Sequence, residues 1–161
     1  MTEVQLRETE SALGFRLPGF LRELYTQLGN GGFPPEYGLM GGIGGYEDDQ
    51  GQTIVTRYNL ARSDPNKYPW PEGLVDVLHW GCACYTAIDC FSSEGTMVFY
   101  DPGHFVPSYA SATPHEDDEP IREDPYPAFR LHAASLEAWY KDFLDGSLKM
   151  ARNNPHWVRT K

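Results

Sequence analysis

The segment of residues 11–32 constrains the fold more than any other part of the chain, because it encodes one short amphipathic helix together with both of its ends. The helix begins at Leu17-Pro18, since proline is favoured in the first helical turn, where its missing N–H is not needed. It ends at Asn30-Gly31-Gly32, whose residues tolerate the left-handed conformation of a helix C-cap. Its apolar face is formed by residues at helical spacing: Phe20, Leu21, Leu24 and Leu28.

A second amphipathic helix is predicted near the C-terminus. Ser135 is placed to cap its first turn, and Gly146 follows its end. Its apolar face consists of Leu136, Trp139, Tyr140, Phe143 and Leu144. We expect Trp139, Phe143 and Leu144 to pack around one central sheet with the leucines of the first segment, Leu17, Leu21, Leu24 and Leu28.

The middle of the chain is rich in β-branched and aromatic residues and predicts strands over residues 74–79, 84–91 and 96–100. The turn 92–95 joins the last two strands as a hairpin. Residues 2–12 predict a first helix, and residues 52–62 predict another, although their β-branched residues also suit a strand. The fold class is therefore α+β, with N-terminal helices, a central antiparallel or mixed β-sheet, and a C-terminal helix packed on the sheet.

Other segments lack a repeating apolar pattern. A short strand or an extended edge fits residues 37–40, and the glycine run 41–45 predicts a flexible surface loop, because it lacks the remaining residues of a phosphate-binding motif. Residues 102–128 are proline-rich and predict a long irregular loop. We place a single domain at residues 1–146 and a basic tail at residues 147–161, which contain no acid.

The three cysteines and His79 invite comparison with a zinc site. Zinc sites bring four ligands to one point, commonly from Cys-x2-Cys pairs. Here one residue separates Cys82 from Cys84, and in an uninterrupted strand Cys82 and Cys90 would stand about 26 Å apart. A cysteine acting with His104 as a nucleophile is a further alternative, but no segment has the signature of a cysteine enzyme. We therefore expect reduced, inert thiols, no bound metal and no cofactor.

Acidic residues gather in two runs, and aromatic residues flank the larger one. Such clusters are typical of solvated loops, yet aromatic side chains within charged surroundings are also common at protein interfaces, so both interpretations stay open. The candidate partner-binding residues are Glu47, Asp48, Asp49, Tyr109, Glu116, Asp117, Asp118, Glu119, Glu123, Asp124 and Tyr126.

The formal net charge of −10 argues against a nucleic-acid-binding protein, which gains affinity from a basic surface. It favours a partner with a basic surface, although acidity also serves solubility alone. The chain has no apolar run of the length that a membrane span needs, and its first residues lack the apolar core of a signal peptide. We expect a cytoplasmic protein.

Several short motifs follow one another in a distinctive order. Near the N-terminus these are Glu10, Leu13-Gly14, Leu17-Pro18 and Asn30-Gly31. The strand region 72–81 ends at a glycine, and Ser135-Leu136 opens a C-terminal helix. Over residues 4–146 this arrangement resembles the SMI1/KNR4 family of the SUKH superfamily. Leu136 stands where that family usually has phenylalanine.

The resemblance implies a protein-binding module without catalysis. Bacterial members of the family are similar to immunity proteins, which bind and neutralise a cognate toxin, often a nuclease, whereas fungal relatives act as regulatory scaffolds. A short acidic chain fits the immunity role better, with a toxin of basic surface as partner. The alternatives are a regulatory scaffold without a toxin partner and, less favoured, an enzyme that uses cysteine and histidine.

Overall fold

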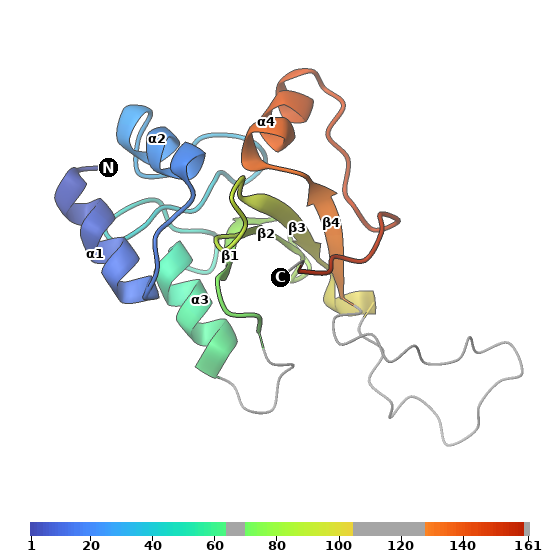
Figure 1. The fold of residues 1–161 in the computed structure, drawn as a ribbon, viewed down its shortest axis with the longest axis horizontal. Coiled ribbons are helices and arrows are strands. Elements are labelled where there is room, and N and C mark those ends of the chain that lie inside the picture. Colours follow the sequence, from blue (N-terminus) through green and yellow to red (C-terminus); the bar gives the residue numbers. More distant parts are fainter. Residues whose placement is uncertain (64–69, 105–127, 160–161) are drawn as a thin grey trace, which may run out of the picture.

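The computed structural model describes residues 1–63, 70–104 and 128–159, which contain four helices and four strands (Figure 1). The helices are α1 (Glu3–Leu13), α2 (Gly19–Gln27), α3 (Ile54–Ser63) and α4 (Leu136–Leu144), with a 3-10 turn η1 (Pro102–His104). The strands are β1 (Leu74–His79), β2 (Tyr85–Asp89), β3 (Thr96–Tyr100) and β4 (Phe129–Ala133). The strands are all antiparallel, in the order β1-β2-β3-β4, so the α+β prediction is confirmed.

Different helices pack on different strands of the sheet. Helix α3 packs against β1 and α1, while α4 packs on β3 and β4 and meets α2. Figure 1 shows α1, α2 and α3 grouped on one side of the molecule, with α4 above the β3–β4 half of the sheet. The core that results contains Leu21 and Tyr25 of α2 and Leu136 and Trp139 of α4, all without measurable exposure. None of the helices in the described ranges has both the length and the apolar character that a bilayer crossing requires.

Two leucines expected in the core lie at the surface. Leu28 is 67% exposed and Leu144 is 79% exposed, so both predictions of burial are wrong. Each is at or just beyond the last residue of its helix: α2 ends at Gln27, before the expected Asn30-Gly31-Gly32 cap, and α4 ends at Leu144. In α2 the buried position is taken instead by Tyr25, whose hydroxyl donates to the Met40 carbonyl.

The glycine run 41–45 is a packed junction, which corrects the expected flexible surface loop. Gly41 and Gly42 are buried. The Gly42 N–H donates to Asn30 Oδ1 over 2.9 Å, and the Ile43 N–H donates to Thr9 Oγ1 over 3.0 Å. A side chain at Gly41 would place its Cβ 2.3 Å from the Asn30 carbonyl oxygen. These glycines therefore let the loop pack closely between α1 and the turn after α2.

The C-terminal segment also differs from the expected trailing tail. Trp157 is only 4% exposed and belongs to the main core. The Leu131 N–H donates to the Pro155 carbonyl and the Trp157 N–H donates to the Phe129 carbonyl, so the segment runs antiparallel beside β4 and covers its edge. Arg152 pairs with Asp101, and Arg159 pairs with Asp89, so two of the basic side chains neutralise carboxylates of the sheet region.

The continuous strand that was assumed for the distance between Cys82 and Cys90 is interrupted. Cys82 and Ala83 have positive φ values of 51° and 61° and form a turn, so β2 begins only at Tyr85. Cys82 is exposed, Cys84 is buried and Cys90 is partly buried, and all are free thiols. A left-handed turn separates Cys82 from β2, so the separation of about 26 Å expected for a continuous strand is wrong.

Candidate functional site

One end of the sheet lies next to the smaller acidic run, over residues 47–49. The strand register aligns His79 of β1 with Tyr85 of β2, Tyr85 with Tyr100 of β3, and Tyr100 with Phe129 of β4. The chain therefore leaves β3 after Tyr100 and enters β4 at Phe129 at the end where β1 finishes. Since neighbouring strands are about 4.8 Å apart, this end spans roughly 15 Å from β1 to β4.

The smaller acidic run lies at the same end, in a turn over residues 48–52. The Asp48 Oδ1 accepts the N–H groups of Gln50 and Gln52, each over 2.9 Å. Asp48 is 8% exposed, so its carboxylate shapes the turn and is not the surface charge that we expected. Glu47 and Asp49 are exposed, and their carboxylates face solvent.

Asp49 is held in place by a buried histidine. Its Oδ1 lies 2.6 Å from Nδ1 of His79, and the side chain of His79 is 3% exposed while that of Asp49 is 52% exposed. The His79 ring stacks on Tyr85 with 4.6 Å between ring centroids. A half-exposed carboxylate is thus fixed to the end of a core strand, which lowers the entropy that it loses on binding a partner.

A buried ion pair supports this arrangement from beneath. Nε of Arg57, on α3, lies 2.9 Å from Oδ2 of Asp76, and the Arg57 guanidinium sits 4.2 Å from the centroid of the Tyr85 ring. Burial raises the pKa of Asp76 to about 7, although Arg57 acts in the opposite direction. Burial also raises the pKa of Tyr85 to about 12. Because Asp76, His79 and Tyr85 are buried, they position the surface residues of this end of the sheet.

Two exposed tyrosines lie beside the acidic turn. Tyr37 is 52% exposed and Tyr46 is 43% exposed. The Tyr46 hydroxyl donates to the Tyr37 carbonyl over 2.6 Å, and the Tyr37 ring lies 6.2 Å from that of His79. Together with Glu47 and Asp49 they form what we call the acidic-aromatic patch: Tyr37, Tyr46, Glu47 and Asp49. Our sequence analysis missed both tyrosines, although Tyr46 directly precedes the acidic run.

A comparison with protein families agrees with this architecture. The family model described as "SMI1 / KNR4 family (SUKH-1)" matches residues 1–142, which is most of the chain. The chain belongs to the SMI1/KNR4 family. The resemblance seen in the sequence motifs is thereby confirmed. The match extends into α4, whereas the segment that covers β4 follows it. No curated protein and no solved structure matches this SMI1/KNR4 chain.

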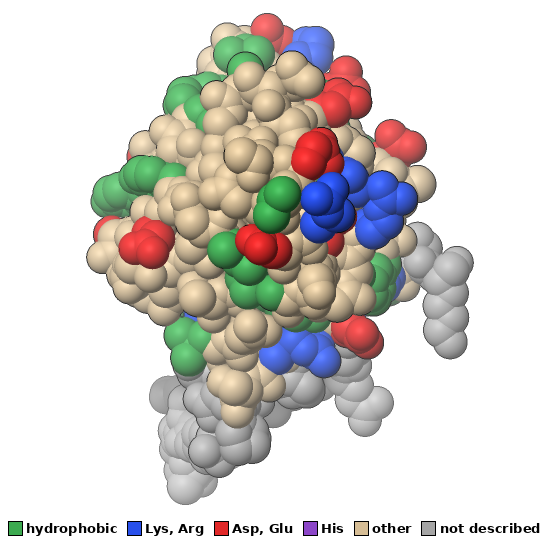
Figure 2. Space-filling model, turned by 90° about the vertical axis from the view of Figure 1, so that its left-hand side faces the viewer, with side chains coloured by type: hydrophobic (Ala, Val, Ile, Leu, Met, Phe, Trp, Pro, Cys, Tyr) green, Lys and Arg blue, Asp and Glu red, His purple; other side chains and the backbone are tan. Residues whose placement is uncertain are grey.

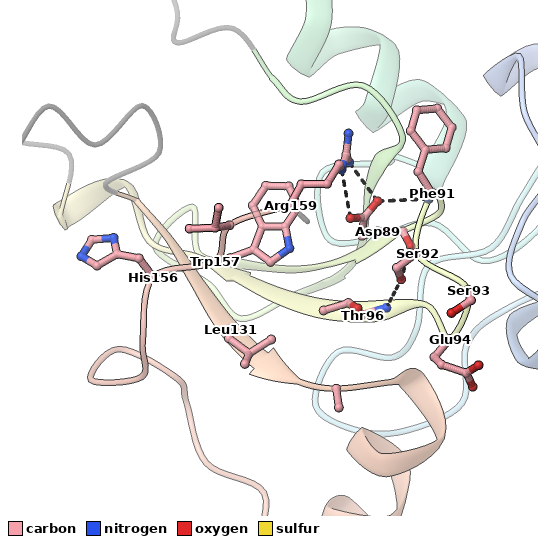
Figure 3. A pocket seen from close by; sticks show the side chains of 12 residues that line it. Asp89, Phe91, Ser92, Ser93, Glu94, Thr96, Leu131, His156, Trp157 and Arg159 are labelled. Atoms are coloured by element: carbon pink, nitrogen blue, oxygen red, sulfur yellow. Dashed lines mark hydrogen bonds and ion pairs between the residues drawn. The ribbon is translucent and has the colours of Figure 1, made fainter. Parts of the chain in front are cut away.

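The opposite end of the sheet carries a hollow of about 500 Å³ (Figure 3). It lies between the turn after β2 and the C-terminal segment, and Asp89, Phe91, Thr96, Leu131 and Trp157 are among its lining residues. Two of its charged side chains neutralise each other, because the Arg159 guanidinium donates to both carboxylate oxygens of Asp89 over 3.0 and 2.9 Å. Asp89 and Arg159 therefore act mainly as a structural ion pair between β2 and the C-terminal segment.

The face on the α1 side gives less indication of a site. Figure 2 shows the α1 side of this SMI1/KNR4 protein, where acidic and basic side chains are interspersed and hydrophobic groups are separated by polar surface. No large apolar patch is visible on this face of the described residues. In the acidic-aromatic patch, by contrast, Asp49 is held by the buried His79.

The predicted site residues fall into two groups. Glu47, Asp48 and Asp49 lie at the patch end of the sheet, with Asp48 buried. The others lie outside the described residues, so their role stays a prediction: Tyr109, Glu116, Asp117, Asp118, Glu119, Glu123, Asp124 and Tyr126.

Proposed function

We propose that this SMI1/KNR4 protein is a non-catalytic protein-binding module that acts in the cytoplasm as an immunity protein and neutralises a cognate toxin. The observation that carries the proposal is the family match over residues 1–142. A net charge of −10 supports a toxin with a basic surface, since opposite charges steer encounter and make the two surfaces complementary. A nuclease is one such partner, because its cleft accepts the phosphates of nucleic acid.

The acidic-aromatic patch is the surface that we propose for the contact. Glu47 and Asp49 supply charge, and the two exposed tyrosines supply apolar area with little conformational freedom to lose. The chain leaves β3 after Tyr100 and enters β4 at Phe129 at this same end, and the larger acidic run lies between these two residues in the sequence. This common origin supports a single acidic face to which both runs contribute.

The proposal is tested by expressing the protein together with the product of the gene adjacent to its own. A toxin in that position should arrest growth when expressed alone, and co-expression should restore growth and yield a complex that co-purifies. A regulatory scaffold, the second family function, would form a complex without relieving any toxicity. Growth arrest that persists in the presence of folded protein would refute the immunity role.

Charge-matched variants then locate the contact. Replacing Glu47 and Asp49 with serine should slow association with the toxin, because long-range attraction acts mainly on the encounter rate. The control replaces Glu72 and Glu94 with serine. These two exposed glutamates precede β1 and β3, at the end of the sheet away from the patch. Both double variants remove the same charge, so a difference between them reports the position of the interface.

A further inference from the structure

The turn over residues 48–52 and the end of β1 bring three potential metal ligands to one point. The ligand atoms of Asp48, Asp49 and His79 all lie within 4.8 Å of one another. We propose that these residues form a binding site for one divalent transition-metal ion. This differs from the expectation of no bound metal, for which His79, 30 residues away from Asp49 in the chain, was compared only with the cysteines.

A buried oxygen without a partner supports the site independently of the clustering. Asp48 Oδ1 accepts two backbone N–H groups, whereas Asp48 Oδ2 is buried and has no hydrogen-bond partner among the described residues. Asp48 as a whole is more than nine-tenths buried, with 8% exposure. Leaving a buried carboxylate oxygen unpaired is costly, since it has lost its water without gaining a donor. A cation held against this oxygen would supply the missing interaction.

The charges around the site also favour a cation. Asp48 and Asp49 are adjacent in the chain and converge on the same point. Arg57 is the basic side chain of the neighbouring buried cluster, and it is already bonded to Asp76 at 2.9 Å. Arg57 is therefore bonded elsewhere, and the neighbour of Asp49 is the His79 imidazole, a common metal ligand when neutral. Like charges held close together repel, and a divalent ion would offset this repulsion.

The ligand set indicates the kind of ion. One imidazole nitrogen and two carboxylate oxygens suit Zn²⁺, Co²⁺ or Ni²⁺, whereas Mg²⁺ and Ca²⁺ prefer oxygen ligands alone. Asp49 is half-exposed, which leaves a path for entry and positions for water. The bound ion would link the turn over residues 48–52 with the end of β1. It would therefore stabilise the folded state, as any ligand selective for that state does.

Calorimetric titration of Zn²⁺ into untagged, chelator-treated protein tests the proposal. We expect about one ion per chain, together with a rise in the thermal midpoint, and no comparable binding of Mg²⁺ or Ca²⁺. Asp49→Asn should weaken Zn²⁺ binding by about tenfold or more, a loss at least as large as that found for residues that only support a metal ligand. Glu47→Gln is the matched control, because Glu47 is exposed directly before the same turn but lies outside the ligand set.

Thiol binding is separated from the proposed site by a second control. Cys82 is exposed, so Cys82→Ser removes the accessible thiol without emptying the core. Binding that survives Cys82→Ser and is lost in Asp49→Asn supports the site. The absence of Zn²⁺ binding, equal affinity in the wild type and folded Asp49→Asn, or loss of binding in Cys82→Ser would each overturn it.

Discussion

Replacing Gly41 with alanine should destabilise the protein strongly, although glycine to alanine is often a favourable change. Gly41 does not have a positive φ, so alanine is not disfavoured by the backbone conformation. The obstacle is space: its new Cβ would lie 2.3 Å from the Asn30 carbonyl oxygen and 2.5 Å from the Tyr46 nitrogen, both backbone atoms. Neither atom belongs to a flexible side chain that can turn away.

The size of the effect follows from what must move. Inserting a methyl group into a packed site costs about 1–3 kcal/mol. Displacing the backbone also strains the hydrogen bonds from Gly41 N–H to Tyr46 O (2.7 Å) and from Tyr46 N–H to Asn30 O (2.8 Å). Each is worth about 1 kcal/mol. We therefore expect a loss of about 2–5 kcal/mol in the free energy of unfolding.

Urea denaturation followed by circular dichroism measures this loss. With a slope of about 1–3 kcal/mol per molar urea, the midpoint should fall by roughly 1 M or more. The control is Gly19→Ala, since a Cβ at Gly19 meets nothing within 4 Å. At this first residue of α2, alanine should be neutral or stabilising by up to about 1 kcal/mol. Equal midpoints for Gly41→Ala and the wild type would refute the packed-junction account of residues 41–45.

Further predictions concern the core, a histidine, an ion pair and the thiols. Leu21→Ala, at a fully buried position, should cost about 2–5 kcal/mol, whereas Leu28→Ala should change stability by no more than about 0.5 kcal/mol in urea denaturation. Burial lowers the pKa of His132 to about 4, below the unfolded value of about 6.5. The unfolded state therefore takes up this proton first, and stability should fall by up to about 3 kcal/mol as the pH drops from about 6.5 to 4; His132→Gln should remove this part of the pH dependence. Arg159→Met should cost about 2–3 kcal/mol by leaving the Asp89 carboxylate without its cation, and adding Asp89→Asn should recover part of the loss in a double-mutant cycle. Cys82 should react at once with Ellman's reagent, whereas Cys84 and Cys90, whose thiol pKa values are raised by burial, should react fully only after denaturation.

The sequence was sufficient for the elements whose signals are local. Ser135 caps α4 as expected, and its hydroxyl accepts the Ala138 N–H over 3.0 Å. The strands over 74–79 and 96–100 lie at the predicted residues, and the ambiguous segment 52–62 is helix α3, at Ile54–Ser63. These features depend on caps, side-chain periodicity and β-branching, which act over a few neighbouring residues.

The errors arose where distant segments determine the outcome. Helical spacing places Leu28 on the apolar face of α2, but only the tertiary structure shows that the helix ends before it. Gly41 and Gly42 read as a surface loop because their packing partners, Asn30 and Thr9, are remote in the chain. Trp157 lies in a segment that reads as a polar tail, yet its hydrogen bonds to β4 place it in the core.

The candidate site shows the same division. The acidity of residues 47–49 is evident in the sequence, but the burial of Asp48 depends on backbone N–H groups of the turn. The contact between Asp49 and His79 requires the 46–52 segment to fold back on β1. The sequence thus shows which side chains carry charge, whereas only the fold shows which of them lie close together.

The most direct test of the account measures association between this protein and the proposed toxin, the product of the adjacent gene, by surface plasmon resonance at low and high salt. If binding uses the acidic-aromatic patch, the Glu47→Ser/Asp49→Ser variant should associate more slowly than the wild type, and its rate should depend less on salt. The Glu72→Ser/Glu94→Ser variant, with the same net charge, should keep more of the wild-type rate at low salt. Equal association rates for the two variants, or no complex with folded wild-type protein, would contradict the account.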